Sequence, residues 1–152
     1  MKQFILLSVL LLTSCGVTGS ESQEEDEKKI DYDDLELPKI AWSDIFLKED
    51  DKYLVYFYSE ECGYCNSIKE EILDYYEMTT RKMYFIDVIE DGNVVINHSF
   101  DSVIGVNDVN NLFIRGTPSL LEIENHAVLN YYAGVQTIRA FISNVEDYNF
   151  SY

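Results

Sequence analysis

Basic residues are scarce in this chain of 152 residues: 11 lysines and arginines stand against 28 aspartates and glutamates, and the formal net charge is −17. A domain with this charge repels a phosphate backbone, so we expect no nucleic-acid partner. The same repulsion argues against electrostatic attraction to anionic lipid headgroups. Contact with a membrane would therefore need a different kind of attachment.

Histidine, cysteine and long apolar runs are also scarce. A zinc site that used Cys62 and Cys65 would need two more ligands, and the only histidines, His98 and His126, lack the paired spacing of such sites. We therefore expect no metal. The apolar run over residues 4–12 is too short to cross a bilayer, and the sequence predicts no transmembrane helix beyond it.

The first fifteen residues have the features of an export signal. Lys2 precedes the apolar run, and residues 12–15 read Leu-Thr-Ser-Cys. This segment resembles a bacterial lipobox, which implies that residues 1–14 are a signal peptide and that Cys15 carries the lipid. The alternative is an ordinary secretory signal with a chance cysteine. Two or three acyl chains hold a protein stably at a membrane, so we expect a lipid-anchored protein on the cell membrane, facing outside the cytoplasm.

Residues 15–38 are expected to be the lipidated cysteine and a flexible acidic tether, and residues 39–152 the folded domain. Nine acidic residues against two lysines give residues 16–38 a net charge of −7. Like charges at this density oppose compaction.

The domain shows alternating helix and strand patterns, which predict an α/β fold. Ser43 is a candidate N-cap for a first helix near residues 40–46, and Asn107 or Asp108 for a short helix that ends at Phe113. The expected strands are residues 53–58, 83–89, 119–124 and 127–132, with a turn at Asn125, and the other expected helices span residues 65–75 and 135–145.

Cys62 and Cys65 lie where the apolar strand 53–58 gives way to a helix. The N-terminus of a helix stabilises an anion, so Cys62 is expected to be the more acidic thiol and to attack a substrate disulfide. Cys65, one turn later, would resolve the mixed disulfide. A purely structural disulfide is the alternative, although a loop this short removes little entropy from the unfolded chain.

The passage over residues 55–65, which ends in Cys-Gly-Tyr-Cys, and the later segment Ile-Arg-Gly-Thr-Pro-Ser over residues 114–119 resemble the two hallmark segments of the thioredoxin superfamily. The resemblance covers about residues 40–148. It implies a three-layer sandwich: a central mixed sheet flanked by helices, with a C-terminal antiparallel hairpin and a closing helix. It also implies a cis bond before Pro118, a substrate-facing loop at Thr117 and Pro118, and no bound cofactor. Tyr64 is expected to bind substrate beside this loop.

Three departures from the family pattern stand out. The buried acid that family members place near the second cysteine would fall at Tyr56. Glu61 replaces the usual tryptophan before the first cysteine. The span from Cys62 to Pro118 is longer than is usual in the family, which places an insertion around residues 90–106.

The expected function is thiol–disulfide exchange, as a reductase or isomerase, on cysteine-containing exported proteins, with a membrane redox partner and a monomeric chain. The alternative is a non-catalytic accessory or binding lipoprotein with the same fold, for example in bacteriocin export.

The lipobox resemblance leads to a direct prediction about Cys15. Mass spectrometry of the membrane fraction should find an N-terminal Cys15 with a diacylglycerol adduct, because the lipid-transfer and cleavage reactions act on this motif. A Cys15→Ser chain should lose the adduct. An intact Met1, or an unmodified Cys15 in the membrane fraction, would contradict the lipoprotein interpretation.

Overall fold

Four strands form one mixed sheet in the order β2–β1–β3–β4. The computed structural model describes residues 31–99 and 101–143. In chain order the elements are η1 (Trp42–Asp44), β1 (Lys52–Tyr58), α1 (Gly63–Asn66), α2 (Lys69–Met78), β2 (Lys82–Asp87), α3 (Val88–Asp91), β3 (Ser119–Glu124), β4 (Ala127–Ala133) and α4 (Val135–Ile142).

β1 occupies the middle of the sheet, between parallel β2 and antiparallel β3. Every residue from Tyr53 to Tyr58 is buried. A strand that is covered on both faces needs a continuous apolar run, which is the pattern predicted for residues 53–58. The strand prediction is confirmed, and so is the mixed sheet.

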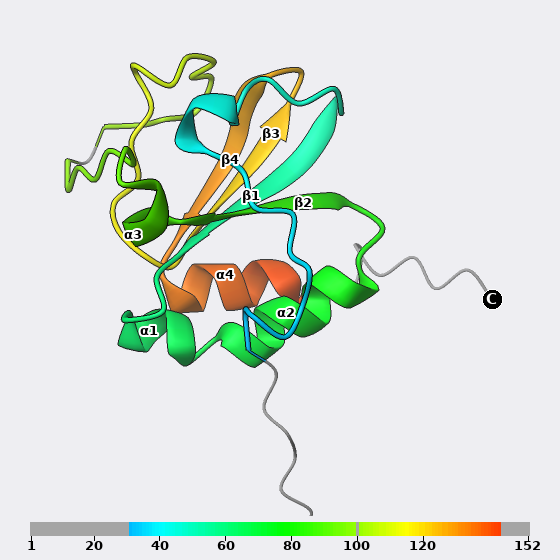
Figure 1. Cartoon of the computed structure of the whole chain (residues 1–152). Helices are drawn as coiled ribbons and strands as arrows, with labels where there is room; N and C mark the ends of the chain where they lie inside the picture. The colour runs from blue at the N-terminus through cyan, green and yellow to red at the C-terminus, as the bar shows by residue number, and fades with distance from the viewer. Residues whose placement is uncertain (1–30, 100, 144–152) are drawn as a thin grey trace, which may run out of the picture.

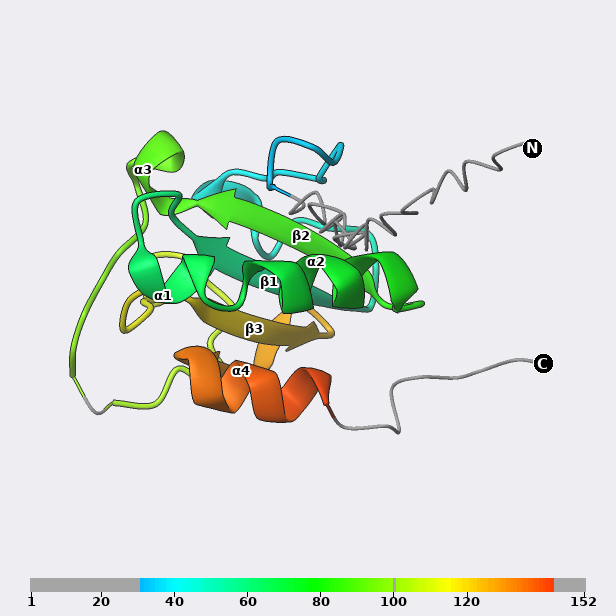
Figure 2. The ribbon, with the colours of Figure 1, turned by 90° about the horizontal axis from the view of Figure 1, so that it is seen from below.

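Side chains of β1 alternate between two cores. Tyr56 and Tyr58 point into the cluster that contains Cys65, on the face that α1, α2 and α4 cover (Figures 1 and 2). Val55 and Phe57 point into the opposite cluster, which η1 and the long segment between α3 and β3 cover (Figure 1). These three layers confirm the expected sandwich. On the second face the cover is mainly irregular chain, with η1 as a single 3₁₀ turn.

The helix expected after the cysteines is broken into α1 and α2 at Ser67 and Ile68. The Ser67 hydroxyl donates to the Tyr64 carbonyl oxygen at 2.8 Å, and the Ser67 carbonyl accepts from Arg139 Nη2 at 3.4 Å. The Ser67 N–H keeps its helical bond to the Gly63 carbonyl at 3.1 Å, so α1 ends at this residue with a capped last turn.

Irregular segments contact both outer strands of the sheet. Pro38 and Ile40 exchange backbone hydrogen bonds with Phe85 of β2, and Gly105 and Val106 bond to Val128 of β4. Such cover satisfies backbone groups that an edge strand would leave exposed.

The C-terminal hairpin follows the prediction. β3 and β4 pair antiparallel around Asn125 and His126, whose φ values are 49° and 60°. Positive φ at both central residues is typical of the tight turns that suit the twist of a hairpin. α4 then closes the fold as expected, ending at Ile142; Val145 lies outside the described residues.

Three local predictions are wrong. Ser43 does not cap η1, because the N-cap is Ala41. The expected helix 107–113 is a turn, in which the Asp108 side chain accepts hydrogen bonds from the backbone and side chain of Asn110. The strand expected to reach Ile89 ends at Asp87, whose carboxylate caps α3 instead.

The folded domain begins earlier than the expected boundary at residue 39. Tyr32 is only 1% exposed, and Leu35 and Leu37 pack against the same cluster. Asp31 also pairs with Lys69 of α2 at 2.9 Å. Residues 31–38 therefore belong to the domain, whereas residues 15–30 lie outside the described residues and their tether role stays a prediction.

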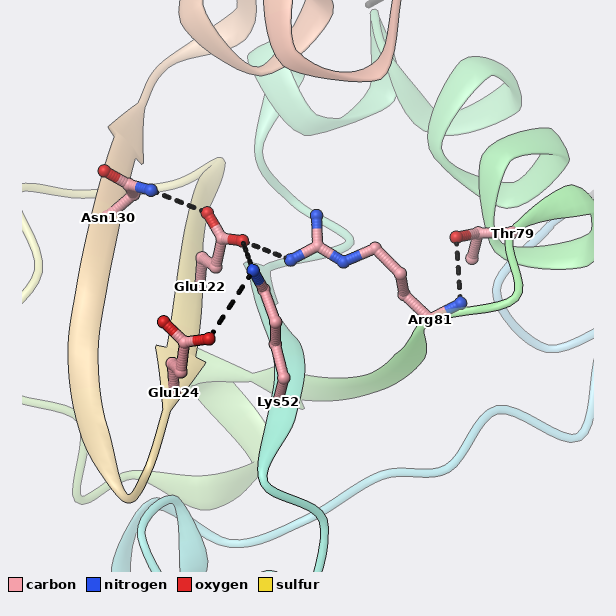
Figure 3. A network of polar contacts seen from close by, with 6 residues as sticks. All are labelled: Lys52, Thr79, Arg81, Glu122, Glu124 and Asn130. Atoms are coloured by element: carbon pink, nitrogen blue, oxygen red, sulfur yellow. Dashed lines mark hydrogen bonds and ion pairs between the residues drawn. The ribbon is translucent and has the colours of Figure 1, made fainter. Parts of the chain in front are cut away.

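The buried carboxylate of Glu122 bonds to side chains from neighbouring segments, at the end of the sheet that lies away from the cysteines. Glu122 of β3 accepts a hydrogen bond from Asn130 of β4 at 2.7 Å and pairs with Arg81 and Lys52 (Figure 3). Burial alone would raise the pKa of Glu122, but the bonds from Asn130 and Arg81 outweigh it and lower the pKa below its ordinary 4.5.

Replacement of Glu122 should therefore cost stability in a pH-dependent way. Because its pKa is lowered in the folded state, the carboxylate stabilises the fold above its unfolded pKa, and this contribution is lost as pH falls through the folded value. Chemical denaturation of Glu122→Gln should show a loss of about 2–4 kcal/mol at neutral pH. The deficit should shrink in acid.

The matched control is Glu124→Gln, because Glu124 lies 3.9 Å from the same lysine but is half exposed. An exposed pair contributes little, so this variant should lose less than about 0.5 kcal/mol. Equal losses in the two variants would contradict a special role for the buried carboxylate.

Candidate active site

The loop after β1 leads directly to both cysteines. The Cys62 N–H donates to the Ser59 carbonyl at 3.1 Å, which turns the chain just past the buried strand. Cys62 is the N-cap of α1, and Cys65 lies within α1. Both are free thiols.

Cys62 is partly exposed, and its sulfur takes part in two hydrogen bonds. Its sulfur accepts from the Cys65 backbone N–H at 3.3 Å, as the side chain of an N-cap residue does. Its thiol donates to the Thr117 carbonyl at 3.4 Å. The first bond offers a donor to a thiolate, and the second brings the Thr117 loop, 55 residues later, against the sulfur.

Cys65 is completely buried in the helix-side cluster. The same cluster contains Ile68, Tyr56 and Tyr58, and Cys65 has no surface exposed to water. The pair therefore has one thiol at the surface and one inside the core.

The two thiols have opposite pKa shifts. Partial burial on its own would raise the pKa of Cys62, but hydrogen bonding to Cys65, Thr117 and the first backbone N–H groups of α1 outweighs it and lowers the pKa. Burial, with a further contribution from Cys62, raises the pKa of Cys65. The Cys62 thiol therefore ionises first.

The Thr117–Pro118 peptide bond is cis, as the resemblance implied. Tyr131 of β4 supports this loop, because its hydroxyl accepts from the Arg115 N–H at 2.6 Å and lies 3.0 Å from the Ser119 hydroxyl. Sequence reasoning missed Tyr131, since nothing in the pattern of β4 separates a tyrosine that supports a loop from one that fills the core.

A groove of about 520 Å³ opens between α1, the cis-proline loop and the start of α4. Tyr64, Thr117 and Pro118 all line it, so the structure brings the expected substrate-facing residues together beside the cysteines. Tyr64 is 74% exposed at the rim. Arg139 also lines the groove and pairs with Glu71 of α2 through Nε at 2.7 Å; the sequence analysis did not single it out.

The remaining singled-out residues lie elsewhere. His126 is in the β3–β4 turn and His98 is in the segment between α3 and β3. Within residues 31–99 and 101–143, no group of three or more His, Cys, Asp or Glu is placed to hold a metal ion. No helix in this part of the chain is long and apolar enough to cross a membrane. Cys15 lies outside the described residues.

Comparison with known proteins agrees with this geometry. A family model described as a thioredoxin-like domain matches residues 44–148. A mutant thioredoxin from Halobacterium salinarum aligns with a TM-score of 0.50 and 20% identity, over 75% of this chain and 95% of its own. Thioredoxin f2 from Chlamydomonas reinhardtii gives 0.51 and 16%, over 74% and 96%. At these identities the likeness concerns the fold. No curated protein matches the chain.

The opposite pKa shifts predict unequal thiol reactivity. Alkylation of the reduced protein with iodoacetamide across pH, followed by peptide mapping, should label Cys62 with a midpoint below the ~8.5 of a free thiol. Cys65 should stay unlabelled until much higher pH. Equal labelling of the two, or faster labelling of Cys65, would contradict Cys62 as the nucleophile.

Proposed function

The chain belongs to the thioredoxin-like domain family, and from this premise we propose that it exchanges thiols and disulfides, with Cys62 as the attacking and Cys65 as the resolving residue. A thioredoxin-like domain with this cysteine pair supports a thiol–disulfide oxidoreductase function. The residue roles are inferred from the contrast between the two cysteines. Cys62 is partly exposed and its sulfur accepts a hydrogen bond from a backbone N–H, whereas Cys65, one helical turn later, is fully buried.

The reaction follows from these positions. The Cys62 thiolate attacks one sulfur of a substrate disulfide, that S–S bond breaks, and the departing thiolate takes up a proton. Cys65 then loses its proton and attacks the Cys62 sulfur. The bond between Cys62 and the substrate breaks, and the second substrate sulfur leaves as a thiolate and takes up a proton, so that one proton is lost and one is gained in this step. Two electrons pass from the cysteine pair to the substrate, and the pair becomes a disulfide.

Tyr64, Thr117 and Pro118 are proposed as the substrate subsite. They line the groove beside Cys62, and the Thr117 carbonyl already touches its sulfur. An extended substrate segment would pair with the Thr117 backbone and displace the thiol from this carbonyl. Tyr64 at the rim would cover the side chain next to the substrate cysteine.

Reduction or isomerisation is the proposed direction. Glu60 and Glu61 are exposed next to Cys62. Their charges oppose a thiolate there, which weakens the reduced form and disfavours a strong oxidant. The proposed setting is the outer face of the cell membrane, with a lipid on Cys15, exported cysteine-containing proteins as substrates and a membrane partner that renews the dithiol.

Mixed-disulfide trapping tests the two roles. Cys65→Ser should accumulate substrates bound through Cys62, because attack still occurs and resolution does not. Both this variant and Cys62→Ser should lose insulin reduction. The trapped species should be released by a reducing agent and identified by mass spectrometry.

Cys62→Ser is the matched control, since it also contains one cysteine and one serine but lacks the exposed nucleophile. It should trap nothing. Trapping through Cys65, or no trapping and no insulin reduction by the unaltered protein, would contradict the proposal and favour a non-catalytic binding role.

A further inference from the structure

The loop over residues 115–118, which faces the groove, is anchored at both ends. Before it, Ile114 exchanges two backbone hydrogen bonds with the segment 95–97, each of 2.9 Å. At its end, the Pro118 carbonyl accepts from the Gly134 N–H at 2.9 Å. The contacts made by the stretch between these anchors therefore determine how the loop presents its backbone to the groove.

Two hydroxyl groups hold that stretch. The Tyr131 hydroxyl accepts from the Arg115 N–H at 2.6 Å, the Ser119 hydroxyl donates to the Gly116 carbonyl at 2.6 Å, and the two hydroxyl oxygens are 3.0 Å apart. A serine has one hydroxyl proton, and the Gly116 carbonyl receives it, so Tyr131 donates to Ser119. The bonds form one directed chain that begins and ends on adjacent residues of the loop.

The surroundings of the chain make it specific. Ser119 is completely buried, so water does not replace Tyr131 as the partner of its hydroxyl. The guanidinium carbon of Arg115 lies 5.9 Å from the centre of the Tyr131 ring, which packs the ring against the loop. Gly116 has a φ of 145°. Because glycine permits many backbone conformations, the bonds around it select this one.

The chain acts on the peptide group that leads to the active site. The Gly116 carbonyl and the Thr117 N–H belong to one planar peptide group, so a bond that fixes the carbonyl also fixes the direction of the N–H. Thr117 lines the groove, and its own carbonyl accepts from the Cys62 thiol at 3.4 Å. An extended substrate segment that pairs with Thr117 would use both of these backbone groups.

We propose that Tyr131 and Ser119 are positioning residues for peptide substrates: their hydroxyl chain orients the Gly116–Thr117 peptide group for pairing with an extended substrate segment beside Cys62. This rests on the proposed oxidoreductase function. The two hydroxyls transfer no proton or electron in the exchange reaction. A disulfide that has no peptide backbone gains nothing from the orientation that they impose.

Two disulfide reagents with the same leaving group test this proposal. One joins a pyridyl thiol to the cysteine of an extended, uncharged peptide, and the other joins it to mercaptoethanol, which has no peptide group. The full chain with Cys15→Ser, reduced and in detergent, has two thiols. Attack by the Cys62 thiolate on the peptide or mercaptoethanol sulfur breaks the S–S bond, and the pyridyl thiolate leaves, takes up a proton and is followed by its absorbance.

In Tyr131→Phe the second-order rate constant with the peptide reagent should fall about fivefold, the factor that corresponds to the net contribution of one hydrogen bond. The rate constant with the mercaptoethanol reagent should not change. Ser119→Ala should show the same selective loss. The double variant should lose no more than the larger single effect, because the two hydroxyls form one chain.

Tyr53→Phe is the matched control. It removes a hydroxyl that donates to the Ile45 carbonyl at 2.5 Å, on the same face of the sheet but near the start of β1, and should alter neither rate constant. An unchanged peptide rate in Tyr131→Phe, equal losses with the two reagents, the same loss in Tyr53→Phe, or additive effects in the double variant would overturn the positioning role. Failure of the unaltered cysteine pair to react with either reagent would instead refute the oxidoreductase function.

Discussion

The reactive groups of this molecule depend on the burial of β1. The strand is paired on both edges and covered on both faces, so a shift of register by one residue would move each side chain into the opposite core, which is packed for different side chains. The position at which β1 ends, Tyr58, is therefore determined by the sheet, and this in turn determines where the following turn begins. Cys62 becomes the cap of a short helix, and Cys65 is directed inward beneath it. The unequal environments of the two thiols follow from this one constraint.

The Thr117 loop depends on the same strand through β3. Because β3 pairs with β1 from Ser119 onward, Pro118 and Thr117 are delivered to the end of the sheet where the cysteines lie. The Thr117 carbonyl then reaches the Cys62 sulfur. Tyr131, on the next strand, holds the loop in place. The active-site geometry is thus a property of three adjacent strands.

Features that depend on local pattern could be predicted from the sequence. A few consecutive residues are enough to indicate each of three such features: the apolar run of β1, the hairpin at Asn125 and the cysteine pair at the start of a helix. Features that depend on distant partners could not. In the sequence Tyr32 has acidic residues on both sides, which is the pattern of the expected tether. Its burial becomes apparent only from its contact with the Tyr58 ring. The contact of Arg139 with the Ser67 carbonyl joins residues 72 positions apart, and no local pattern indicates it.

The central claim is that Cys62 and Cys65 form one reversible two-electron pair. Equilibration with glutathione redox buffers, followed by acid quench and mass analysis, measures this directly. The expected result is a Cys62–Cys65 disulfide that forms and disappears in a single transition, at a potential more negative than the ~−120 mV of a strong oxidant. A persistent glutathione adduct on Cys62 beside a free Cys65, or no disulfide across the series, would contradict the claim.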